Sequence, residues 1–273
     1  MKKGKFLKYC LIFIWLLFIL APYMWMFITS LKSPEELYTF PLKYFPSKPT
    51  FEGYKLLLQT TPFLIYMKNS IIVAVFTVII ALFVAILASY SFSRFEFKGK
   101  TPLSFIFLIT QMFPAILLAI PLFLVMRNIG VLNSPFSLIL AHSTFAVPFS
   151  TWMITGFLNS IPKELDEAAQ IDGCNKLGVL RYVIIPVAAP GLIAATIYIF
   201  IYSWNEFLYA LTFTSDIRAR TIPVGLHTFM GEYIIRWDLL TAGGVITGLP
   251  VIIIFMFIQK YLIKGLTEGA IKG

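Results

Sequence analysis

The stretch Glu167-Ala168-Ala169-Gln170-Ile171-Asp172-Gly173, followed by Val183-Ile184-Ile185-Pro186, decides the interpretation of this chain. It lies in a polar segment, 159–186, between two long apolar runs. Pro162 and the early carboxylates are typical of a helix start, because proline lacks only a donor that is unused there and acidic groups complement the positive helix end. Gly173 suits the left-handed conformation that ends a helix. The segment therefore predicts a compact helix–turn–helix, with the second short helix at about 175–184.

The composition predicts that lipid surrounds most of the chain. Of the 273 residues, 59% are hydrophobic and 13% are charged, and the mean hydropathy is +0.84. A soluble domain carries about 25% charged residues. The net charge of +9 is spread over short segments between apolar runs, so it indicates membrane topology rather than nucleic-acid binding. Cys10 and Cys174 show no metal-ligand spacing and are interpreted as reduced thiols.

Six segments are long and apolar enough to cross a membrane as helices, which takes about 20 residues each. They are 9–28, 69–92, 102–126, 136–158, 187–213 and 239–258. If the N-terminus is inside, 13 of the 22 Lys and Arg residues fall in the cytoplasmic segments 1–8, 93–101, 159–186 and 259–273. This excess sets the orientation. We therefore predict an all-α polytopic membrane protein, a single transmembrane domain over 1–273, with both termini in the cytoplasm. The outer segment 29–68, rich in proline and aromatic residues, is expected to be an ordered cap on the membrane surface.

The polar side chains within the spans each have two interpretations. Glu206, late in the fifth span, either lies on a solute path or partner contact, or is structural near the outer interface, since a carboxylate in a span faces the bundle interior or a wet cavity. Trp204 is suited either to stacking on a sugar ring or to anchoring the helix at the interface. Asn205 and Gln111 are further candidates for the path. Gln111, like Asn69, is also of a type that bridges helices.

Two observations argue against a catalytic, metal-binding or ATP-binding site on this chain. His142 and His227 have no carboxylate or second ligand at a useful sequence spacing, so both are expected to be structural or incidental. Gly99-Lys100-Thr101 ends like a phosphate-binding loop, but Arg94 stands where that loop requires glycine. We therefore expect no catalytic residue, no metal and no cofactor on this chain, and any ATP must be bound by a partner.

The polar segment resembles the EAA motif of ABC importer permeases, which reads Glu-Ala-Ala, three residues, Gly, nine residues, Ile, any residue, Leu-Pro. Val183 and Ile185 replace its Ile and Leu, and the other motif residues match. In that family the loop 159–186 would be a coupling loop whose first helix enters a cleft of the ATPase subunit. The resemblance implies that the ATPase is contacted through Glu164, Glu167, Ala168, Ala169, Asp172, Gly173 and Pro186.

Further stretches are similar to the MalG-like permeases of carbohydrate importers, and they extend the resemblance over nearly the whole chain. They are 94–100, 112–115, 203–207 and the ending 265–273. The resemblance implies that the tail, 264–273, enters the interface between two ATPases, through Gly265, Leu266, Thr267, Gly269, Lys272 and Gly273. It also implies the type I importer fold and a place in the cell membrane. The implied partners are a MalF-like second permease, a dimer of ABC ATPases that binds ATP and Mg, an extracellular or periplasmic sugar-binding protein, and membrane lipid, with no nucleic acid.

The sequence thus predicts the permease subunit of an ATP-driven importer for a sugar or oligosaccharide. One alternative is a permease for a non-sugar solute such as a glycerol-phosphate compound. Another is a stand-alone secondary carrier, which would predict internal repeats and coupling carboxylates at mid-membrane. The sequence shows neither of these features, and it does not identify the solute.

Overall fold

The chain folds into two compact units. The computed structural model describes residues 2–231 and 233–270. One unit is built from Met1–Leu64 and Gly225–Ile252, and the other from Ile65–Val224 and Ile253–Gly273.

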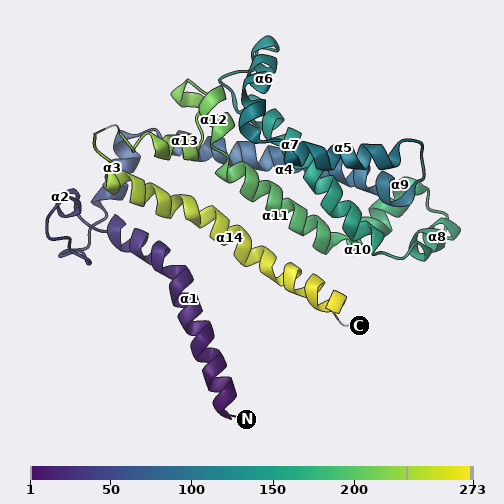
Figure 1. Cartoon of the computed structure of the whole chain (residues 1–273), viewed down its shortest axis with the longest axis horizontal. Helices are drawn as coiled ribbons and strands as arrows, with labels where there is room; N and C mark the ends of the chain where they lie inside the picture. Colours follow the sequence, from purple (N-terminus) through teal and green to yellow (C-terminus); the bar gives the residue numbers. More distant parts are fainter. Residues whose placement is uncertain (1, 232, 271–273) are drawn as a thin grey trace. The chain divides into compact units, whose positions relative to one another are not determined.

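Long apolar helices dominate the described residues (Figure 1). Four of them are long and apolar enough to cross a membrane: α1 (Lys2–Ser30), α4 (Phe63–Arg94), α7 (Pro135–Asn159) and α14 (Trp237–Ala270). Two bent pairs also qualify, namely α5 (Lys100–Met112) with α6 (Ala115–Asn128), and Lys176–Val187 with α11 (Ala189–Asn205). The described chain therefore has four candidate spans, or six if each bent pair is one span. The expectation of an all-α chain is met, while six spans and their orientation stay a prediction.

Short helices connect these long ones. They are α2 (Pro34–Leu37), α3 (Glu52–Thr60), α8 (Glu164–Ile171), α9 (Lys176–Val179), the π-helix η1 (Leu180–Ile184), α10 (Ile185–Val187), α12 (Leu208–Phe213), the 3₁₀-helix η2 (Ile217–Ala219) and α13 (Ile222–His227). Apart from one isolated bridge between Met230 and Ile235, the described residues contain no β-structure.

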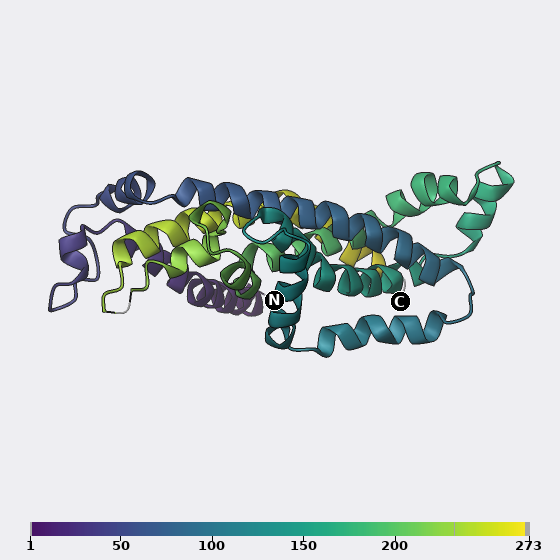
Figure 2. The ribbon, with the colours of Figure 1, turned by 90° about the horizontal axis from the view of Figure 1, so that it is seen from above.

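The helix predicted over 102–126 is broken in the structure. Phe113 takes an extended backbone conformation, with φ −73° and ψ 125°, directly before Pro114. A proline disfavours the helical conformation of the residue before it, which accounts for the end of α5 at this point. The axes of α5 and α6 differ in direction by 102°, and Figure 2 shows α6 turning away from α5.

The first unit contains the segment predicted to be an ordered cap, and that segment is folded. Lys32 is 2% exposed and donates a hydrogen bond from Nζ to Lys43 O at 2.6 Å. Its loss of hydration lowers the pKa of Lys32, an effect larger than the opposing attraction of Glu36. Tyr38 Oη donates to Ile235 O at 2.7 Å, which joins this segment to the start of α14. The position of the segment on a membrane surface stays a prediction.

The second unit is organised around α7, which packs against both α5 and α11. One buried apolar cluster includes Val73, Leu138, Phe145, Tyr209 and Phe213. A second cluster joins α4 and α7 to the polar segment 159–186, and it includes Tyr90, Leu158, Ala169, Val179 and Ile184. The polar segment is therefore not a loose loop, because part of the apolar core extends into it.

Candidate functional site

The first helix of the polar segment, α8, begins as its sequence predicts. Glu164, Asp166 and Glu167 occupy its first turn. The carbonyl oxygen of Lys163 accepts hydrogen bonds from Asp166 N at 2.9 Å and Glu167 N at 3.2 Å. Pro162 precedes this turn, and the three carboxylates lie at the positive end of the helix, where they are favourable.

The corner after α8 is closed by a Schellman motif. Gly173 has φ +89°, the left-handed conformation predicted for it. Cys174 N donates to Ala169 O at 2.9 Å, and Gly173 N donates to Gln170 O at 3.0 Å. These are the two hydrogen bonds that define the motif. The corner therefore has a fixed direction, set by a residue that tolerates positive φ.

The polar segment 159–186 thus forms a helical hairpin, whose second half consists of three short helical pieces. Asn175 caps α9 by accepting a hydrogen bond at Oδ1 from Gly178 N at 2.8 Å. The π-helix η1 and then α10 follow, and Pro186 lies in α10. The axis turns by 79° where α11 begins. The predicted helix at 175–184 is thus present and continues to Val187.

One face of α8 is exposed, and Glu167 at its edge also lines the pocket described below. Glu164, Glu167, Ala168 and Ile171 lie at helical spacings of three and four residues and share this face. Ile171 is 87% exposed. Leu177 in α9 is 69% exposed. We call this surface, with Asp172 and Gly173 at the corner, the hairpin surface. Figures 1 and 2 both show the hairpin at one end of the second unit.

The two alanines of the expected contact differ in their surroundings. Ala168 is exposed, whereas Ala169 is 7% exposed and packs into the apolar cluster with Val179 and Leu158. Only Ala168 can therefore let another protein's backbone approach closely. Ala169 instead allows α8 to lie close to its own support.

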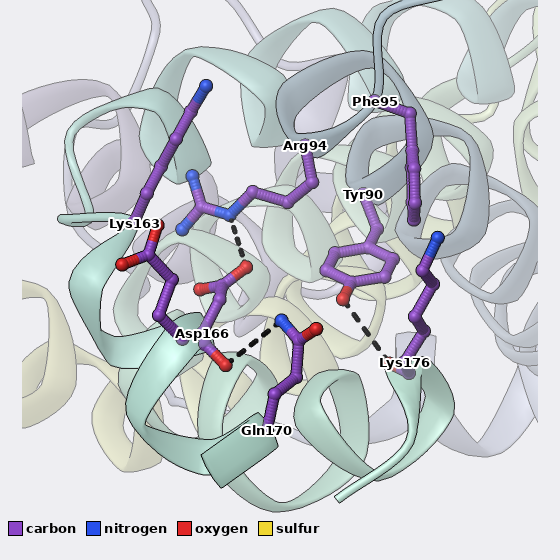
Figure 3. A pocket seen from close by; sticks show the side chains of 8 residues that line it. Tyr90, Arg94, Phe95, Lys163, Asp166, Gln170 and Lys176 are labelled. Carbon is purple, nitrogen blue, oxygen red and sulfur yellow. Dashed lines mark hydrogen bonds and ion pairs between the residues drawn. The ribbon is translucent and has the colours of Figure 1, made fainter.

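Behind the hairpin surface is a pocket of about 270 Å³. Figure 3 shows its polar walls, which come from α4, α8 and α9. Arg94, the last residue of α4, donates from Nε to Asp166 Oδ2 at 2.8 Å. Tyr90 Oη donates to Lys176 O at 3.2 Å. The ammonium group of Lys176 lies 4.6 Å from the ring centre of Phe95.

Sequence reasoning missed this arrangement. From the sequence alone, Arg94 is a topogenic charge, and Asp166 is part of an acidic first turn. The available signal was an arginine that ends a long apolar helix, together with an acidic loop predicted on the same side of the membrane. Their pairing needs the tertiary contact across 72 residues.

Next to this pocket, an exposed ion pair follows α4. Lys100 Nζ donates to Glu96 Oε1 at 2.7 Å. This hydrogen bond, with the charge of Lys100, lowers the pKa of Glu96. The pair lies within one short stretch of chain, and Lys163 at the start of α8 acts on Glu96 through its charge, as the smallest of the effects on that carboxylate.

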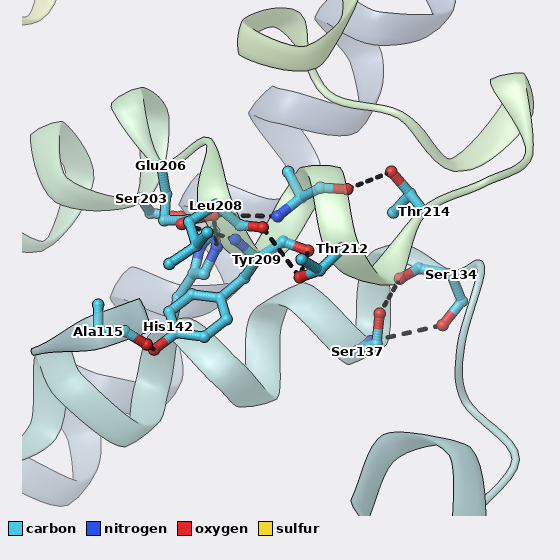
Figure 4. Close-up of polar contacts among 11 residues, drawn as sticks. Ala115, Ser134, Ser137, His142, Ser203, Glu206, Leu208, Tyr209, Thr212 and Thr214 are labelled. Atoms are coloured by element: carbon cyan, nitrogen blue, oxygen red, sulfur yellow. Dashed lines mark hydrogen bonds and ion pairs between the residues drawn. The ribbon is translucent and has the colours of Figure 1, made fainter. Parts of the chain in front are cut away.

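A buried polar cluster lies where α11 ends (Figure 4). His142 in α7 is 1% exposed, and its Nδ1 lies 2.8 Å from Ser203 Oγ, while its Nε2 lies 3.2 Å from Glu206 Oε2. The two carboxylate oxygens of Glu206 also accept from Tyr209 N at 2.9 Å and Ala210 N at 3.2 Å. His142 thus has a carboxylate partner that its sequence spacing does not show, and its role as a structural residue stays a prediction. Sequence spacing does not report a contact made between two helices.

The other candidates for a solute path are engaged with the protein itself. Trp204 is 2% exposed and stacks on Phe200, with ring centres 5.4 Å apart, so it presents no free face for a sugar in this conformation. Gln111 bridges α5 to α7 by donating to Phe145 O at 3.1 Å. Asn205 is exposed and donates to Ile201 O within α11.

The expected tail contacts lie at the end of the described residues. The backbone of 265–270, which includes Gly265, Leu266, Thr267 and Gly269, continues the helix α14. Lys272 and Gly273 lie outside the described residues. Contact of the tail with an ATPase dimer stays a prediction.

Comparison with known proteins points to one family. Residues 77–268 match the family described as binding-protein-dependent transport system inner membrane component. Among curated proteins, the sulfoquinovosyl glycerol transport system permease protein SmoH of Agrobacterium fabrum is 36% identical, over 99% of this chain and 95% of that protein. The trehalose/maltose transport system permease protein MalG of Thermococcus litoralis is 37% identical, over 93% of this chain and 92% of that protein.

A solved structure has a similar fold. It is the crystal structure of a bacterial ABC transporter involved in the import of the acidic polysaccharide alginate, matched with a TM-score of 0.82 and 25% sequence identity. The match covers 95% of this chain and 96% of the matched chain. The matched segment of the sequence family also contains the whole hairpin, the buried polar cluster and Arg94.

Proposed function

Because the chain belongs to the family of binding-protein-dependent transport system inner membrane components, we propose that it is one of two permease subunits of an ATP-driven importer for a sugar or oligosaccharide. The permease names of its relatives support a transport role. We assign the hydrolysis of ATP to a separate dimer of ABC ATPases. A MalF-like second permease completes the path through the membrane.

The hairpin surface is the observation that carries this proposal. An exposed isoleucine and leucine, beside carboxylates on a helix with a fixed corner, form a surface suited to a protein partner. The apolar cluster packs against the inner face of α8, so a force applied by a partner can move the helix without unfolding it. We propose that the ATPase cleft receives the surface formed by Glu164, Glu167, Ala168, Asp172 and Gly173.

In this proposal, transport is driven by the different affinities of ATP for two conformations of the importer. A nucleotide shifts a conformational equilibrium only if it binds one state more tightly than the other. The ATPase dimer has this property when it closes on ATP, and its closure would displace the hairpin. The displaced hairpin would change the path from inward-open to outward-open, so that an external binding protein releases its solute into the path.

The coupling role is tested by Glu167→Lys, which reverses a charge on the hairpin surface, and by Gly173→Pro, which cannot keep φ +89°. In the complex reconstituted in liposomes, we expect solute uptake per ATP hydrolysed to fall by about tenfold, within the usual range of coupling between two sites. Uptake and ATP hydrolysis are measured on the same vesicles.

Lys98→Glu is the matched control, because Lys98 is an exposed charge on the same predicted side and lies outside the hairpin. It should leave the ratio unchanged. Normal uptake per ATP by both Glu167→Lys and Gly173→Pro would reject the coupling role. Uphill uptake by the purified chain without an ATPase would reject the whole proposal.

The solute is tested by stimulation of ATP hydrolysis in the complete complex with its binding protein. The relatives' names and the matched structure mention trehalose/maltose, sulfoquinovosyl glycerol and alginate. The screen therefore includes neutral disaccharides, glycosides of glycerol and acidic oligosaccharides, together with glycerol-phosphate compounds. Stimulation by a glycerol-phosphate compound alone would replace the sugar assignment.

A further inference from the structure

The last turn of α4 is connected to both halves of the hairpin. Tyr90 and Arg94 are four residues apart, so they share one face of α4. Arg94 reaches α8 through Asp166, and Tyr90 reaches the start of α9 through the carbonyl oxygen of Lys176. Figure 3 shows both contacts on opposite sides of the same pocket.

Arg94 also binds the end of α7. Its Nη1 donates to Leu158 O at 3.1 Å, and its Nη2 donates to Ile161 O at 3.2 Å. Leu158 lies in the last turn of α7, where a cation is favourable because it faces the negative end of the helix, and Ile161 follows directly after the cap. Beside Arg94, Ser93 Oγ donates to Asn159 Oδ1 at 2.8 Å. One guanidinium group therefore joins α4, α7 and α8.

The chemistry of the group favours a fixed geometry. Guanidinium is planar and presents its donors in a rigid fork, so it can hold three acceptors in set directions, unlike the ammonium group of lysine. The side chains of Arg94 and Asp166 are 5% and 11% exposed. Separating them would leave a charge buried without its partner, which is unfavourable.

The link to α8 passes through one oxygen atom. Asp166 Oδ2 accepts from Arg94, whereas Asp166 Oδ1 is buried and has no hydrogen-bond partner within the described residues. Removing the Asp166 side chain thus breaks this one ion pair. The contacts of Arg94 with Leu158 and Ile161, and the apolar cluster under α8, do not involve that side chain.

We propose that Arg94 is a positioning residue for energy coupling: its guanidinium group joins α8 to α4 and α7, so that a displacement of the hairpin is passed to both helices. Tyr90 makes the second connection, from α4 to α9. This inference rests on the proposed function, because it requires that an ATPase moves the hairpin. It adds the route by which the movement leaves the hairpin.

The test uses Asp166→Ala in the complete importer reconstituted in liposomes. The hairpin surface is unchanged in this variant, so we expect the ATPase subunits to co-purify normally. We expect solute uptake per ATP hydrolysed to fall by about fivefold or more. Asp166→Asn should restore most of the ratio, because its amide oxygen can still accept a hydrogen bond from Arg94 Nε.

The matched control is Glu96→Ala. It also removes a carboxylate that pairs with a basic residue, but this pair is exposed and lies within one stretch of chain. It should leave the ratio unchanged. A purely structural role for Arg94 would lower the amount of assembled complex while leaving uptake per ATP of the assembled fraction normal.

An unchanged ratio in assembled Asp166→Ala complexes would overturn the inference. If Asp166→Ala fails to assemble, uptake per ATP is measured for Arg94→Lys instead. Lysine keeps the positive charge but lacks the planar set of donors of the guanidinium group. A reduced uptake per ATP hydrolysed then supports the inference, and a normal value overturns it.

Glu167→Lys is measured in parallel, to distinguish a failure of the inference from a failure of the proposed function. If Glu167→Lys is uncoupled while Asp166→Ala is normal, only the inference fails. If Glu167→Lys and Gly173→Pro are both normal, the proposed coupling role fails.

Discussion

Single residues explain why the hairpin has one shape. Gly173 has φ +89°, and no atom beyond its own residue and its two chain neighbours lies within 4 Å of the position that a Cβ would occupy there. Glycine is therefore favoured here because of the positive φ, and not because a larger side chain would clash with its surroundings. It was predictable from sequence, because a glycine directly after a helix commonly takes the left-handed conformation. The contact between Arg94 and Asp166 was not predictable, since either residue alone resembles an ordinary charge near a membrane surface.

Glu206 can be tested at the same scale. It accepts two backbone hydrogen bonds at the start of α12 and lies beside His142, so its described contacts are structural. Glu206→Ala should lower the free energy of unfolding by about 1–3 kcal/mol, because buried donors lose their acceptor. The measurement is a denaturant titration of the detergent-solubilised protein.

Glu206→Gln is the companion variant, since its amide oxygen can still accept from the backbone. It should recover part of the lost stability and retain uptake. If Glu206→Ala is as stable as the original protein but fails to transport the solute, the path interpretation of Glu206 is favoured instead.

At the scale of elements, the apolar helices can be predicted from the hydrophobic runs in the sequence, but not every bend in them can. The positions of α1, α4, α7 and α14 could be predicted because long apolar segments have few alternatives. The break at Phe113 could not be located, because proline is tolerated in many membrane helices and only the packing decides which of them bends. The break at Ala188, in contrast, lies next to the predicted start of the span 187–213. Seven prolines fall within the bounds of the predicted spans, yet the described residues contain two sharply bent helix pairs.

The helix α14 carries the prediction about the tail. Deleting residues 265–273 removes the ending that resembles the carbohydrate-importer permeases, while the predicted span, 239–258, stays intact. We expect fewer ATPase subunits to co-purify with the permease pair, and uptake to fall in proportion. The measurement is the ratio of ATPase to permease in the purified complex.

A variant in which the same nine positions are replaced by glycine and serine controls for length. It should behave like the deletion if the side chains make the contact. Unchanged co-purification and uptake in both variants would show that the tail does not contribute to the capture of the ATPase.

At the scale of the whole molecule, the orientation in the membrane depends on the distribution of positive charge. The excess of Lys and Arg in the predicted cytoplasmic segments is moderate, 13 of 22 residues. Short basic segments next to the spans determine orientation more strongly than long loops do. The hairpin and the segment 29–68 are therefore predicted to lie on opposite sides of the bilayer.

Labelling with a membrane-impermeant thiol reagent tests this topology. In a Cys10→Ser and Cys174→Ser background, Leu177→Cys places a thiol at an exposed hairpin position, and Lys48→Cys places one at an exposed position in the segment 29–68. In cells that express the permease without its ATPase, intact cells should label Lys48→Cys only, and inverted vesicles should label Leu177→Cys only. Labelling of both from the same side would contradict the six-span arrangement.

The sharp corner between α5 and α6 affects how motion can spread through the second unit. A continuous helix carries a displacement along its axis because its hydrogen-bond ladder is unbroken. At Phe113 and Pro114 that ladder is interrupted, and the direction changes by 102°. Because the two axes differ in direction by this angle, an axial shift of α5 would displace the first residue of α6 sideways and would tilt α6 rather than slide it.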